Sequence, residues 1–162
     1  MPTYSFKNYF CRYKSSDGSL VNVDLYDTAG QENFHAISKS YYQKTDSCLL
    51  VYSISDRNSF DEIKNYYNPK IKEYCKKNIK VVLLGNKTDL ENERKVSPEE
   101  GSDFALKNDY LFMETSCLKN EHVSDAFETL IEITNNENNR EDVTFSIGKK
   151  SNKKKDKKNC QQ

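Results

Sequence analysis

Apolar and polar residues alternate in the segment Val21-Asn22-Val23-Asp24-Leu25, which predicts a strand. A period of two is typical of a strand with one buried face. The preceding Ser15-Ser16-Asp17-Gly18 has the composition of a tight turn, and Tyr9 to Tyr13 is placed to form the partner strand. We therefore predict a β-hairpin over residues 9–25.

Three further segments are almost continuously apolar and do not alternate. They are Cys48 to Ile54, Ile79 to Leu84 and Tyr110 to Met113. Continuous apolar runs suit the strands of a parallel sheet that is covered on both faces. We predict that these three segments are buried strands of one such sheet.

Helical periodicity falls between these segments. Ser97 is a candidate N-cap, followed by Pro98 at the first helical position and a capping-box Glu100. Apolar residues recur at spacings of three and four in two stripes, which are Phe60, Ile63, Tyr67, Ile71 and Tyr74, and Val123, Ala126, Phe127, Leu130 and Ile131. Strands that alternate with helices predict an α/β layer fold with a mainly parallel sheet.

The periodicity stops near Asn135, and the charge of the chain changes there. From Lys149 onward the sequence has seven lysines and one acid, whereas the preceding body has 18 basic and 24 acidic residues. We predict a domain over 1–135 and a disordered polybasic tail over 136–162. An acidic body with a basic tail argues against a nucleic-acid-binding domain.

The five cysteines do not suggest a disulfide framework. Their number is odd, and no two have the spacing of a CxxC motif. The sequence also has no apolar signal segment and no apolar run long enough to cross a bilayer. We therefore expect reduced thiols in a cytoplasmic protein.

Candidate chemistry begins in Asp27-Thr28-Ala29-Gly30-Gln31-Glu32, directly after the alternating strand. Asp27, at a strand end, can hold a magnesium ion. Gly30 allows a backbone N–H to approach a phosphate. Gln31 can orient an attacking water, which is what phosphoryl transfer to water requires of its nucleophile. For one of these residues a plain turn would be the better interpretation, but the whole hexapeptide favours a phosphate site.

This hexapeptide resembles the switch II motif of small GTPases. Downstream, Asn86-Lys87-Thr88-Asp89 resembles the family's NKxD motif and follows the apolar strand that ends at Leu84. The resemblance implies that Asn86, Lys87 and Asp89 bind guanine. A carboxylate at Asp89 can accept two hydrogen bonds from the guanine N1–H and amine, a donor pair that adenine lacks.

A third segment, Glu114-Thr115-Ser116-Cys117, resembles the family's ETSA motif. The resemblance implies that Ser116 steadies the loop and that the backbone amides at Ser116 and Cys117 reach the guanine oxygen. Cys117 stands where the family usually has alanine, and Leu118 stands where it usually has a lysine beside the base.

Among small GTPases, the sequence is most similar to Rab proteins over roughly Met1 to Ile133. The segments that carry this similarity are Leu50 to Ser55, Val96 to Gly101 and Phe112 to Ser116. The resemblance implies a P-loop NTPase-like small GTPase domain that binds GTP or GDP with Mg²⁺ and regulates vesicle traffic. It also implies a monomer whose partners are exchange factors, GTPase-activating proteins and effectors.

The phosphate-binding pattern G-x-x-x-x-G-K-[ST] does not occur in residues 1–162. Only Gly148 is followed by lysine, and Val143 and Lys150 occupy the other two defining positions. Pro2-Thr3 resembles the switch I motif, which implies magnesium coordination by Thr3. We therefore expect a domain truncated at its amino end, which lacks the first strand, the P-loop and the first helix.

In the family fold, the strand expected to be missing lies between the strands at 21–26 and 48–54. We expect its loss to leave two facing strand edges with unpaired backbone groups, each costing about 1–3 kcal/mol if buried. The alternatives are that the sheet closes up or that a partner strand fills the gap.

The tail combines Lys149 to Lys158 with Cys160. Rab relatives carry prenylated cysteines in this region, so the resemblance implies lipidation of Cys160 and peripheral attachment to the anionic cytosolic face of endomembranes. A solvated lysine tail is the plainer interpretation. Three interpretations stay open. The chain is a GTPase switch, a degenerate protein-binding module without productive GTP binding, or an incomplete gene product.

Overall fold

The computed structural model describes residues 7–27 and 39–149, with side chains described over 9–27 and 39–136. The strands β1 (Lys7–Lys14) and β2 (Leu20–Asp27) form an antiparallel hairpin, as the sequence predicts. Its register places Tyr9 opposite Leu25 and Cys11 opposite Val23. The turn between the strands contains Gly18 at a φ of 86°, a conformation that glycine adopts without strain.

The three apolar runs form one parallel sheet in the order β3-β4-β5. Its strands are β3 (Ser47–Ser53), β4 (Lys80–Asn86) and β5 (Leu111–Thr115). The central β4 is buried from Val81 to Gly85, because helices cover it on both faces. The predicted parallel sheet is therefore confirmed for these three strands.

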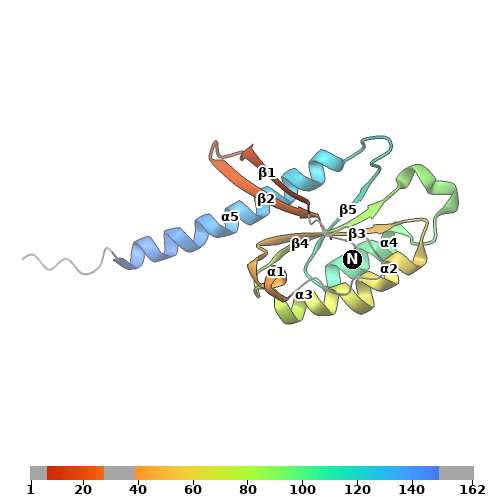
Figure 1. Ribbon diagram of the computed structural model, residues 1–162, viewed down its shortest axis with the longest axis horizontal. Coiled ribbons are helices and arrows are strands. Elements are labelled where there is room, and N and C mark those ends of the chain that lie inside the picture. Colours follow the sequence, from red (N-terminus) through yellow and green to blue (C-terminus); the bar gives the residue numbers. More distant parts are fainter. Residues whose placement is uncertain (1–6, 28–38, 150–162) are drawn as a thin grey trace, which may run out of the picture.

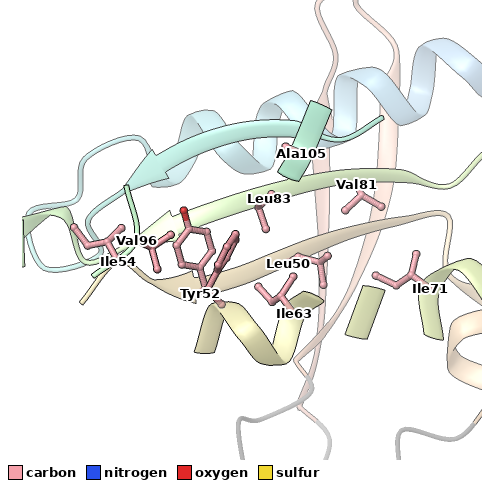
Figure 2. Close-up of a cluster of buried hydrophobic side chains, with 10 residues drawn as sticks. Leu50, Tyr52, Ile54, Ile63, Ile71, Val81, Leu83, Val96 and Ala105 are labelled. Carbon is pink, nitrogen blue, oxygen red and sulfur yellow. The ribbon is translucent and has the colours of Figure 1, made fainter. Parts of the chain in front are cut away.

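The helices lie on the two faces of this sheet (Figure 1). Phe60, Ile63, Ile71 and Ala105 pack with the Leu50 side of the sheet, whereas Ala126 and Leu130 pack on Val82 and Leu84 of the other. Figure 2 shows the larger of the two clusters between β3, β4 and the helices. The helical elements are α1 (Lys39–Lys44), α2 (Arg57–Glu62), η1 (Ile63–Tyr67), α3 (Asn68–Tyr74), η2 (Thr88–Glu93), α4 (Pro98–Lys107) and α5 (Val123–Lys149).

The predicted helix over residues 60–74 contains a π-helical segment, η1, where the sequence pattern predicts regular α-helix. The Asn68 N–H donates to the Ile63 carbonyl, five residues earlier. Pro69 follows and has no N–H, and in a regular α-helix its ring would clash with the carbonyl four residues before it. A wider turn at this point relieves that clash.

Helix α4 begins at Pro98 as predicted, but the Glu100 carboxylate, which a capping box directs to the Ser97 N–H, bonds to Arg57 of α2. Ser97 is its N-cap, and the Ser97 hydroxyl accepts a hydrogen bond from the Glu100 N–H. The Glu100 carboxylate accepts a hydrogen bond of 2.6 Å from Arg57 on α2. Ser97 therefore fixes the start of α4, and Glu100 connects α4 to α2.

The hairpin and the parallel sheet are not joined by strand pairing in the described part of the chain. Figure 1 shows the hairpin beside α5. Its turn bonds to Glu132 of that helix, and near its base the rings of Tyr26 and Tyr41 lie 5.8 Å apart. Closing of the sheet by pairing of β2 with β3 was one of the two alternatives expected from the sequence. The structure does not show this pairing in the residues it describes.

Helix α5 extends to Lys149, beyond the position near Asn135 where the apolar periodicity ends. The sequence predicts disorder from residue 136, whereas the structure has a helical backbone over 136–149. A polar helix can continue from a packed one because each added residue gains a backbone hydrogen bond without a new nucleation step. Residues 150–162, which include Cys160 and all the lysines of the basic tail except Lys149, lie outside the described residues.

Candidate functional site

Two loops that follow neighbouring strands come together at one edge of the parallel sheet. Asn86 ends β4, and Lys87 then takes a left-handed conformation with a φ of 69°. This turn leads into η2, which carries Asp89 in its first turn. Ser116 and Cys117 follow directly after β5, which is paired with β4.

A buried hydroxyl joins the two loops. The Ser116 hydroxyl is fully buried and donates to Oδ1 of Asp89 at 2.5 Å. The same hydroxyl oxygen accepts a hydrogen bond of 3.1 Å from the Lys119 N–H. Ser116 thus fixes the Asp89 carboxylate and closes its own loop through these two hydrogen bonds.

Asn86 makes a second connection between the loops. Its Oδ1 accepts hydrogen bonds of 3.3 Å from both the Thr115 hydroxyl and the Cys117 N–H. The Cys117 amide is thereby held close to the end of β4. The Cys117 and Leu118 side chains are exposed, with Leu118 82% exposed.

Arg94 connects the same two parts of the chain through hydrogen bonds to two carboxylates. Arg94 donates to Glu114 on β5 at 2.7 and 3.0 Å, and to Glu91 in η2 at 2.8 and 2.7 Å. Its guanidinium also donates to the Val96 carbonyl at 3.0 Å. These carboxylates raise the pKa of Arg94 above its usual range, and Arg94 lowers the pKa of Glu91. The cation connects η2 to β5 and keeps its charge at any pH at which the protein folds.

Motif matching on the sequence did not single out Arg94. Arginine and glutamate are common surface residues, and their spacing of 20 positions along the chain carries no periodic signal. Glu114 was part of the third motif, but without a role of its own. The one available clue is that parallel pairing places the ends of β4 and β5 together.

The described arrangement suits recognition of a planar base that carries hydrogen-bond donors. Asp89 supplies a half-buried carboxylate whose position Ser116 fixes, and the Cys117 N–H of the loop after β5 donates to Asn86. A fixed carboxylate can accept hydrogen bonds from the donor edge of guanine. The Asp89 carboxylate is therefore an acceptor that suits the donor edge of a guanine base.

The phosphate and metal side of the predicted site is described only in part. Asp27 is exposed at the end of β2, in the separate hairpin. Thr3, Gly30 and Gln31 lie outside the described residues, as does Cys160. Among the side chains that the structure describes, no group of three or more His, Cys, Asp or Glu is arranged to hold a metal ion.

No helix in the described ranges is both long and apolar enough to span a membrane.

Comparison with known proteins agrees with the motifs. The model of the Ras family matches residues 1–136. Ras-related protein Rab-11B of Dictyostelium discoideum is 37% identical over 142 residues, which cover 78% of this chain and 64% of that protein. GTP-binding protein ypt3 of Schizosaccharomyces pombe is 38% identical over 115 residues, or 71% and 53%. Ras-related protein Rab-8A of Bos taurus is 40% identical over 114 residues, or 70% and 55%. The chain thus spans about half to two thirds of the length of these relatives.

Proposed function

Because the chain belongs to the Ras family of small GTPases and is similar to Rab proteins, we propose that it is a guanine-nucleotide-dependent switch of vesicle traffic. The observation that carries the proposal is the pair of loops at Asn86 to Asp89 and Ser116 to Cys117. They are held together by hydrogen bonds from the Ser116 hydroxyl to Asp89 and from the Cys117 N–H to Asn86. Preorganised polar groups of this kind favour one base over another, because a mismatched base leaves them unpaired.

Each residue of the site has a distinct part in this proposal. Asp89 accepts from the donor edge of guanine. The Cys117 amide, which donates to Asn86 in this structure, would donate to the guanine oxygen when the base is bound. Ser116 and Asn86 position these two groups, and Lys87 turns the chain so that η2 can begin. Mg²⁺, when bound, would neutralise phosphate charge, and Asp27 with Thr3 would hold it. Gln31 would orient the water that attacks the terminal phosphate.

A second candidate is a protein-binding module that does not bind GTP productively. It is favoured by the absence of G-x-x-x-x-G-K-[ST] from residues 1–162 and by the lack of pairing between β2 and β3 in the described residues. Backbone amides and a lysine are what cradle nucleotide phosphates in the family pattern. For residues 1–162 by themselves, we accordingly expect GTP affinity well below that typical of small GTPases.

Titration of residues 1–162 with a fluorescent GTP analogue in magnesium separates the two candidates. Circular dichroism confirms that the chain is folded during the titration. Saturable, guanine-specific binding at submicromolar concentration supports the switch in this chain. A folded chain without such binding supports the second candidate for these residues.

Substitution of Asp89 tests the base-reading role in any nucleotide-binding form of the protein. Asp89→Asn replaces an acceptor that faces the guanine donors by an amide, so preference should shift from GTP toward xanthine nucleotides. Glu93→Gln, a change in the same helix η2 at an exposed carboxylate, is the matched control. An unchanged preference in Asp89→Asn would remove this residue from base reading.

We also propose regulation and membrane attachment of the kind known for Rab proteins. Exchange factors, GTPase-activating proteins and effectors are the partners expected for a cytoplasmic monomer of this type. One lipid at Cys160 plus the basic tail would give the two signals that stable anchoring requires. Cell fractionation of the Cys160→Ser variant beside the unchanged protein tests this, and a wholly soluble unchanged protein would refute it.

A further inference from the structure

The turn of the β1–β2 hairpin converges on one carboxylate of α5. Glu132 Oε2 accepts from the Ser15 hydroxyl at 2.7 Å and from the Ser16 hydroxyl at 3.0 Å. Glu132 Oε1 accepts from the Ser16 N–H at 2.7 Å and from the Tyr13 hydroxyl at 3.2 Å. Hydrogen bonds from Ser15 and Ser16 lower the pKa of Glu132, so the carboxylate is charged at neutral pH. We call this set of contacts the Glu132 clamp.

The Glu132 clamp attaches the tip of the hairpin to the rest of the protein. One turn further along α5, Asn135 donates to the Ser15 and Ser19 hydroxyls at 3.3 Å each. Neither β1 nor β2 pairs with β3, β4 or β5 in the part of the chain that the structure describes. The position of the hairpin tip therefore depends on polar contacts, which a change of charge can reverse.

Ser16 is the member of the clamp that an enzyme could reach. It is exposed, whereas Ser15 is 4% exposed. Arg12 and Lys14, four and two residues before Ser16, are also exposed. A hydroxyl in a turn after exposed basic residues suits a protein kinase with an acidic substrate groove.

We propose that Ser16 is a phosphorylation site for a kinase directed to basic segments, and that phosphorylation releases the hairpin from α5. The Ser16 oxygen attacks the terminal phosphorus of a nucleoside triphosphate held by the kinase. A new P–O bond forms, the bond to the leaving diphosphate breaks, and the hydroxyl proton passes to a base of the kinase. The step leaves a phosphoserine and a nucleoside diphosphate.

Charge and hydrogen bonding both favour release. A phosphate group carries about −1.5 to −2 charges at neutral pH. At Ser16 it would replace a hydroxyl that now donates to the negatively charged Glu132. The carboxylate would lose this donor and gain a like charge at close range. Rotation of the turn away from α5 relieves the repulsion, and it also breaks the bond from the Ser16 N–H.

The test combines phosphorylation in vitro with hydrogen exchange. The full chain is incubated with a basic-directed protein kinase and magnesium ATP, and mass spectrometry locates the phosphate. Amide exchange over residues 9–25 is then compared with exchange over β4, whose amides report whether the domain stays folded. We expect phosphate on Ser16 and exchange in the hairpin about tenfold faster or more, with β4 unchanged.

Substitutions test whether charge is the cause. Ser16→Glu should accelerate hairpin exchange more than Ser16→Gln, which has nearly the same size and no charge. In Glu132→Lys, phosphorylation should slow hairpin exchange, since the phosphate would then face a cation. The proposal is overturned if the kinase leaves Ser16 unmodified, if phosphorylation leaves hairpin exchange unchanged, or if Ser16→Glu and Ser16→Gln behave alike.

Discussion

The Ser116 hydroxyl lies 2.5 Å from Oδ1 of Asp89, and this contact spans 27 positions along the chain. It joins the loop after β5 to the helix that follows β4. Because Ser116 is fully buried, its hydroxyl cannot exchange this partner for water. The carboxylate proposed to read guanine is therefore fixed by a group that would not itself touch the base.

Removal of this hydroxyl should destabilise the domain. In Ser116→Ala, both the Asp89 carboxylate and the Lys119 N–H lose their partner at Ser116. We expect a loss of about 1–3 kcal/mol in the free energy of unfolding, measured by urea denaturation. Ser102→Ala, at an exposed position of α4, should stay within about 0.5 kcal/mol of the unchanged protein. Equal effects of the two changes would contradict the role given to Ser116.

The two carboxylates bound by Arg94 should differ in their effect on stability. The Glu114 side chain is 22% exposed, whereas that of Glu91 is 63% exposed. Glu114→Gln should therefore be the more destabilising change, and a double-mutant cycle with Arg94→Gln should give a coupling of about 0.5–3 kcal/mol. Glu91→Gln should cost no more than about 1 kcal/mol, because water screens an exposed pair. A larger loss for Glu91→Gln would be inconsistent with this structure.

The core contains a hydroxyl group without a partner. Tyr52 is 1% exposed, and its hydroxyl has no hydrogen-bond partner among the residues that the structure describes. Tyr52→Phe should raise the free energy of unfolding, by up to about 1–3 kcal/mol, since an unsatisfied buried group costs about that much. In contrast, the Tyr110 hydroxyl donates to Asn68 at 2.7 Å, so Tyr110→Phe should lower stability. Thermal unfolding of both variants checks the difference in sign.

Thiol reactivity should separate the cysteines by burial. Burial raises the pKa of Cys48 from 9.0 to about 12, whereas Cys11 and Cys117 are exposed. The thiolate is the reactive form, so Cys48 should be alkylated more slowly than the exposed Cys11 and Cys117 near neutral pH. Mass spectrometry of peptides after timed alkylation measures each rate. Rapid modification of Cys48 in the folded protein would contradict its packing against the core.

The raised pKa of Cys48 also predicts the direction of its effect on stability. Its folded pKa of about 12 exceeds the ordinary value of 9.0, so folding favours the neutral thiol. This contribution is fully present below pH 9 and is lost as the pH rises toward 12. In Cys48→Ala, the decline of stability across this alkaline range should be correspondingly shallower.

Local patterning was sufficient for most of the elements. Runs of apolar residues predicted the three parallel strands, and alternation with a turn predicted the hairpin. Ser97 and Pro98 predicted the start of α4 correctly, because capping depends on neighbouring residues alone. The segments that resemble the family's guanine motifs were also identifiable, since each is contiguous and follows a strand.

Other features depend on residues that are distant in sequence. The contacts of Arg94 with Glu114 and of Glu132 with Ser16 join groups whose separation along the chain has no period. The wide turn η1 depends on where Pro69 lies in a packed helix. The stripe of apolar residues does not carry this information. The sequence therefore determined the elements and the chemistry of their ends. Tertiary packing decided which of those ends meet, because side-chain contacts across elements follow from topology and burial.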